Sequence, residues 1–150
     1  MEWLGQLGFA LPLGLGATGS ALGIGAAGRA AAGAWAKEAR EGKPLNFLYV
    51  ALLGMPLSQL IYGFVISLVL LRGKAPTDSA EAAAWFSIGL ACGLGELFSA
   101  WMQGVIGAGG IRAISEVGRK PFVLSIIAMG IAETVGLFAA FLMFLLAPAG

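Results

Sequence analysis

Histidine is absent from this sequence of 150 residues, cysteine occurs once, and charged residues make up only 11% of the chain. The absence of histidine excludes metal sites, catalytic triads and proton relays built on imidazole. The single Cys92 cannot form a disulfide within the chain. A net charge of +1 provides no basic surface for nucleic acid. Carboxylates, amides and hydroxyls are therefore the groups left to carry function.

Apolar residues are abundant instead, at 59% of the chain, with a mean hydropathy of +0.89. Such a composition does not suit a soluble protein with a wettable surface. The sequence holds apolar stretches at residues 4–36, 45–71, 80–115 and 121–146. Each is longer than the roughly 20 residues that a helix needs to cross a bilayer. We predict an all-α membrane protein with four transmembrane helices.

The four predicted helices form two tandem hairpins, at about residues 1–75 and 76–150, within a single membrane domain. Little chain remains outside the spans, and no Gly-Lys-Ser/Thr phosphate-binding sequence is present. We therefore expect no catalysis, and no ATP hydrolysis, by this chain alone.

Lysine and arginine are concentrated in two of the connections, residues 37–44 and 115–120, whereas only Arg72 and Lys74 flank the other one. Cytoplasmic loops carry the excess of basic residues in membrane proteins. We therefore predict that the loops 37–44 and 115–120 are cytoplasmic and that both termini lie outside. Arg29 and Arg112 lie farther into the spans, where we expect their side chains to extend to the interface.

The two halves of the sequence resemble one another. Gly-Ile-Gly-Ala-Ala-Gly-Arg-Ala at 23–30 is echoed by Gly-Ala-Gly-Gly-Ile-Arg-Ala at 107–113, and Lys43-Pro44 by Lys120-Pro121. These matches indicate a duplication. In the same register Gln59 is equivalent to Glu133, so one copy carries a carboxylate and the other an amide.

Glu133 is the only charged residue after Lys120, and it lies at about the middle of the last apolar stretch. Placing an ionisable side chain in a bilayer costs at least about 2.5 kcal/mol on insertion scales, so we expect Glu133 to have a function that offsets this cost.

The first and third stretches are rich in glycine, with nine residues from Gly5 to Gly33 and seven from Gly89 to Gly110. We expect these two helices to pack backbone against backbone.

A polar face is predicted on the second helix, where four residues follow the i, i+3, i+4, i+7 spacing: Met55, Ser58, Gln59 and Tyr62. Pro56 removes one helical hydrogen bond beside that face. Together with Gln103 and Glu133, these groups offer several oxygens, one of them anionic, which suits Na⁺. Hydrogen bonding between helices is the alternative explanation for the neutral ones.

These residues resemble the proteolipid of V-type ATPases, also known as the K or c subunit, which is the duplicated four-helix protomer of a closed rotor ring. The resemblance rests on Pro56-x-Ser58-Gln59-x-x-Tyr62-Gly63-Phe64-Val65, on Leu97-Phe98-Ser99 with Gln103-Gly104, and on Ala132-Glu133-Thr134. It implies a Na⁺-type member from a bacterial inner membrane. It further implies that Glu133 is the ion carboxylate, with Gln59, Gln103, Ser58 and the main-chain carbonyl of Met55 as ligands. Tyr62 would support the carboxylate.

The resemblance also implies the partners and the mechanism. Identical protomers form the ring, a stator subunit supplies a membrane-embedded arginine, and central-stalk subunits dock on the cytoplasmic loops. The ring carries ions through the lipid while ATP is hydrolysed on other subunits, and the chain itself binds no cofactor. The same role with H⁺ is the first alternative, and a small proton-coupled exporter and a purely structural membrane protein are more distant ones.

Glu96 departs from the family pattern, which has no second acidic group at this place. It precedes Gln103 by seven residues and so shares roughly its face, about 10 Å nearer the outside. We expect Glu96 to be protonated and structural. An exit route and a second cation site are the alternatives.

Overall fold

The computed structural model describes residues 2–71 and 75–148. Its elements are α1 (Glu2–Arg40), α2 (Leu48–Gly54), the short 3₁₀ helix η1 (Met55–Leu57), α3 (Ser58–Leu71), α4 (Ser79–Val117) and α5 (Phe122–Leu146). The described residues contain no strand. Four helical runs are long and apolar enough to cross a membrane: Trp3–Arg40, Leu48–Val69, Ser79–Val117 and Phe122–Leu146. The prediction of an all-α fold with four transmembrane helices is confirmed. Arg72 and Lys74, which entered the predicted orientation, lie outside the described residues.

The second span begins at Leu48, three residues later than predicted, and it is interrupted at Pro56. The Asn46 side chain accepts a hydrogen bond from the Leu48 amide at 3.1 Å, which fixes the start of the helix. Pro56 has no amide to donate to the Leu52 carbonyl, and the chain passes through η1 there. The freed Leu52 oxygen faces α4, because a Cβ atom built on Gly107 would lie 2.8 Å from it.

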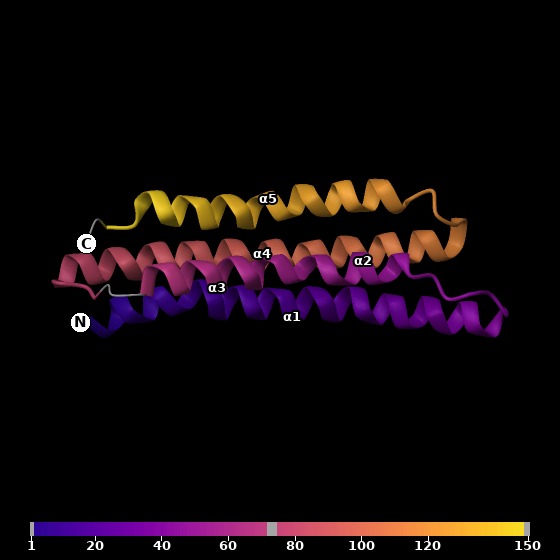
Figure 1. Ribbon diagram of the computed structural model, residues 1–150, viewed down its shortest axis with the longest axis horizontal. Helices are drawn as coiled ribbons and strands as arrows, with labels where there is room; N and C mark the ends of the chain where they lie inside the picture. Colours follow the sequence, from indigo (N-terminus) through magenta and orange to yellow (C-terminus); the bar gives the residue numbers. More distant parts are fainter. Residues whose placement is uncertain (1, 72–74, 149–150) are drawn as a thin grey trace.

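The helices α1 and α4 lie side by side along most of their length, while α3 lies against α1 and α5 lies against α4 (Figure 1). A Cβ atom built on Gly104 would overlap the main chain of Gly23, and one on Gly89 would overlap that of Gly8. Only glycine permits such a close approach, so the predicted backbone-to-backbone packing of the two glycine-rich helices is confirmed. The helix α5 presents bulky side chains outward, such as Ile131 and Phe138.

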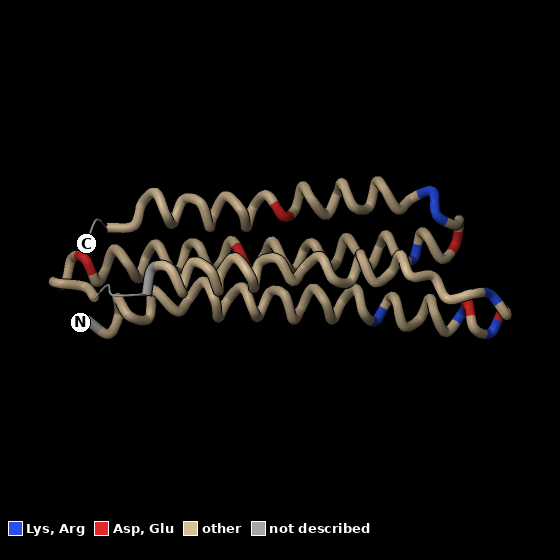
Figure 2. The backbone as a smooth tube through the Cα atoms, in the orientation of Figure 1, with Lys and Arg blue, Asp and Glu red and all other residues tan. Residues whose placement is uncertain are grey.

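The described lysines and arginines gather at one end of the bundle, which we call the basic end: it carries the α1–α2 and α4–α5 connections (Figure 2). Acidic residues also occur at mid-length in α4 and α5, where Glu96 and Glu133 lie (Figure 2). Basic residues are thus confined to one end of the bundle, whereas Glu96 and Glu133 place carboxyl groups at its mid-length.

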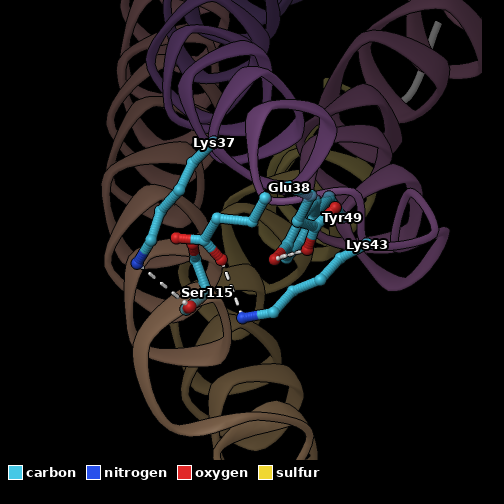
Figure 3. Close-up of polar contacts among 6 residues, drawn as sticks. Lys37, Glu38, Lys43, Tyr49 and Ser115 are labelled. Carbon is cyan, nitrogen blue, oxygen red and sulfur yellow. Dashed lines mark hydrogen bonds and ion pairs between the residues drawn. The ribbon is translucent and has the colours of Figure 1, made fainter.

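Buried Glu38 holds the α1–α2 connection in place at the basic end. Its carboxylate accepts hydrogen bonds from the Tyr49 hydroxyl at 2.7 Å and from the Asn46 amide at 2.9 Å. Figure 3 shows Glu38 and Tyr49 beside Lys37, Lys43 and Ser115. Since two donors from the following segment converge on one carboxylate of α1, the connection is fixed against the helix.

Candidate ion-binding site

Glu133 projects from α5 toward α3 and α4, and a donor from each of these helices holds its carboxylate. The Tyr62 hydroxyl, on α3, donates to Oε1 at 2.8 Å. The Gln103 amide, on α4, donates to Oε2 at 3.4 Å. Glu133 is half-buried, whereas its neighbours Ile131 and Val135 are well exposed on the outer face. The carboxylate therefore lies at the boundary between the helix bundle and the lipid.

Gln103 is fully buried and only half satisfied. Its Nε2 atom donates to the Met129 carbonyl at 3.2 Å as well as to Glu133. Its Oε1 atom has no hydrogen-bond partner within the described part of the chain. An amide oxygen that is buried and unpaired is costly unless something binds it. This oxygen, one side chain away from Glu133, is an available ligand for a cation.

The remaining predicted ligands form a second group on α2, η1 and α3. Ser58 Oγ lies 3.0 Å from the Met55 carbonyl oxygen and 3.1 Å from Gln59 Oε1, so its single proton serves one of them at a time. The Met55 carbonyl also accepts the backbone amide of Ser58. Gln59 is fully buried and makes no direct hydrogen bond to Glu133.

Ser99 joins this second group to α5, and the sequence analysis assigned it no role. Its hydroxyl accepts from Gln59 Nε2 at 3.0 Å and donates to the carbonyl of Ala132, the residue before Glu133, at 2.8 Å. Ser99 precedes Gln103 by four residues, so helical spacing places both on one face of α4. That spacing was the signal that could have identified it.

Ser20 is a second polar residue that the sequence analysis did not single out. The Leu60 amide donates to its hydroxyl at 3.2 Å. Ser20 is buried on α1, and it is equivalent to Gln103 if Arg29 is aligned with Arg112. The position that is occupied by the predicted amide ligand Gln103 in the second half thus supports the backbone of α3 in the first half.

Glu96 lies in the core, with none of its side chain exposed and no hydrogen-bond partner for either oxygen among the described residues. A Cβ atom built on Gly136 would lie 2.8 Å from Glu96 Oε2 and 3.1 Å from Gln59 Cγ, so the carboxyl faces α5 beside the Gln59 side chain. On the α1 side, a Cβ atom built on Gly16 would lie 3.6 Å from Glu96 Cβ. Glu96 therefore borders the second group of predicted ligands from within the bundle.

The site residues come from both halves of the chain, and comparison with known families explains this arrangement. The family model of the ATP synthase C subunit matches the chain twice, at residues 7–70 and 86–146. The two matches correspond to the two halves that the internal repeat indicated, and each contains one hairpin of apolar helices. A comparison with curated proteins found no match.

The family settles the general role. Its members are membrane rotor subunits that assemble into rings within ATP synthase-type complexes and are not catalytic themselves. The expectation that this chain is no enzyme on its own is thereby confirmed, and the exporter and purely structural alternatives are set aside. The chain belongs to the family of the ATP synthase C subunit, as an integral membrane protein that contains two copies of the family's helical hairpin and serves as an ion-carrying rotor subunit.

Proposed function

We propose that this chain is the rotor-ring protomer of a V-type rotary ATPase and that it carries Na⁺ at Glu133 while ATP hydrolysis elsewhere in the complex turns the ring. The observation that carries the proposal is the asymmetry of the two halves. Glu133 is a half-buried carboxylate at the lipid boundary, whereas the equivalent Gln59 is a fully buried amide. One carboxylate for four helices lowers the number of ions carried per turn, which suits pumping.

The proposed Na⁺ ligands are Glu133, Gln103, Gln59, Ser58 and the Met55 carbonyl. The unpaired Oε1 of Gln103 supports a cation over a proton, because a protonated carboxyl needs only one acceptor or donor nearby. Half a turn of the Gln103 amide exchanges its nitrogen and oxygen, and the oxygen then faces Glu133 Oε2. Ser58 would release the Met55 carbonyl by turning its hydroxyl toward Gln59. Tyr62 keeps its hydrogen bond to the other oxygen of Glu133.

Charge neutralisation couples ion binding to rotation in this proposal. A bare carboxylate facing hydrocarbon is strongly unfavourable, so only the occupied site can rotate through the lipid. A membrane-embedded arginine of the stator stabilises the empty carboxylate while the ion is exchanged. Glu96 stays protonated and structural, because neither of its oxygens accepts a hydrogen bond from the described residues, as a charged form would require.

The proposed setting is a bacterial inner membrane, with the basic end in the cytoplasm and both termini outside. The excess of lysine and arginine in the loops 37–44 and 115–120 supports this orientation. Central-stalk subunits would dock on these loops, and the fixed geometry around Glu38 gives them a defined surface.

Carbodiimide labelling of the purified ring tests the ion assignment, because only a protonated and unoccupied carboxyl reacts. Labelling is measured across a pH series with Na⁺, with choline as a large inert cation, and with neither. Peptide mapping assigns the label to Glu133 or Glu96. We expect Na⁺ to protect Glu133 and choline not to.

The other outcomes separate the alternatives. If labelling of Glu133 is the same with and without Na⁺, the transported ion is H⁺ and the proposed Na⁺ rotor is wrong. A complete lack of labelling at Glu133 would remove the basis for treating it as the ion carrier.

A further inference from the structure

A groove of about 360 Å³ lies between α1 and α4 at the basic end, outside the ion-binding site. We call it the basic groove, and its lining residues are Arg29, Ala30, Gly33, Ala34, Lys37, Arg112, Ser115 and Glu116. The small residues on α1 leave its space open. Both helices contribute cationic residues to its lining.

The basic groove carries uncompensated positive charge. Three cationic side chains, Arg29, Lys37 and Arg112, share it with the single anion Glu116. In the described ranges none of the three forms an ion pair, and the Lys37 ammonium only approaches the Ser115 carbonyl at 3.5 Å. Like charges that share a concave surface repel one another and raise the affinity for an anion.

The Arg29 side chain does not extend toward the membrane interface, as the sequence had led us to expect. A Cβ atom built on Gly25 would lie 3.6 Å from Arg29 Nη1. Gly25 is one turn nearer the middle of α1, so the guanidinium is directed back along the span and away from the basic end. A guanidinium held at that depth requires an anion or water beside it.

We propose that the basic groove binds the phosphate of an anionic phospholipid headgroup. Arginine forms paired hydrogen bonds to phosphate, and basic pockets between transmembrane helices are known to hold anionic headgroups. Two turns nearer the middle of the span, Leu22 on α1 and Val105 on α4 lie on the faces of Arg29 and Arg112. Their side chains are 45% and 46% exposed. Cations at the end of an apolar surface complement a lipid, with its charged head and its acyl chains, better than they complement a free anion.

Native mass spectrometry of the intact ring, purified and then exposed to phosphatidylglycerol vesicles, tests the proposal. The variant Arg29→Gln/Arg112→Gln removes two cations of the groove. We expect it to retain about 30-fold less phosphatidylglycerol, given the usual attraction of each basic residue for anionic lipid. Arg40→Gln, which changes an exposed cation of α1 outside the groove, should retain the wild-type amount. Phosphatidylcholine should not be retained by any of them.

Two further measurements keep the result decisive. If the double variant fails to assemble, Lys37→Gln alone should still lower retention about fivefold, and Arg29→Lys/Arg112→Lys should preserve it. Labelled inorganic phosphate is offered separately to lipid-depleted rings. Retention of phosphatidylglycerol that is equal in wild type and both glutamine variants would overturn the proposal, and so would binding of inorganic phosphate with no retention of the lipid.

Discussion

Replacing Tyr62 by phenylalanine removes one hydroxyl that donates to Glu133 Oε1 at 2.8 Å and leaves the rest of the α3 face in place. A hydrogen bond to a charged group contributes about 1.5–3 kcal/mol, against about 0.5–1.5 kcal/mol for a neutral one. In the unoccupied site a proton competes with Na⁺ for the carboxyl, so the hydroxyl favours the Na⁺-bound carboxylate by the difference, about 1–1.5 kcal/mol. Apparent Na⁺ affinity at a fixed pH should fall about 5- to 10-fold in Tyr62→Phe.

The assay is the concentration of Na⁺ that halves carbodiimide labelling of Glu133 in the assembled ring. Tyr49→Phe is a matched control, because the Tyr49 hydroxyl donates to Glu38 at 2.7 Å at the basic end. This control should leave the protection by Na⁺ unchanged. An assembled Tyr62→Phe ring with wild-type protection by Na⁺ would refute the role given to the hydroxyl.

Three further substitutions, with Gly28→Ala as a control, test the carboxylates and the glycine packing. Glu133→Gln should abolish ATP-driven ion transport in vesicles. The ring should still assemble, since the equivalent position of the first half already carries an amide, at Gln59. Residual transport would contradict the carrier role. Glu96→Gln should keep transport within about twofold, because a neutral amide replaces a neutral acid of similar shape, whereas a complete loss would point to a cation on Glu96. Gly104→Ala should lower ring stability by about 1–3 kcal/mol, because its new methyl group would overlap the Gly23 backbone. Gly28→Ala meets no atom within 4 Å and should leave the melting temperature unchanged, so equal effects of the two alanines would count against the proposed packing.

The membrane class, the number of spans and the place of Glu133 were predictable from the sequence, because each depends on local composition or on one residue in an apolar run. The packing of the glycine-rich helices was predicted in the same way, since small side chains permit two helix backbones to approach closely. The start of the second span was misplaced by three residues. The apolar stretch of the sequence begins at Leu45, whereas the helix begins at Leu48, whose amide donates a hydrogen bond to the Asn46 side chain.

The tertiary structure decided which polar groups meet, because that depends on the rotation of each helix about its axis. Tyr62 and Gln103 contact Glu133 directly, while Gln59 is linked to α5 only through Ser99. The sequence placed Glu96 on the same face as Gln103, yet its contact with Gly136 required the packing of α5. A one-dimensional pattern specifies the faces of single helices, and only the packed bundle determines which faces lie together.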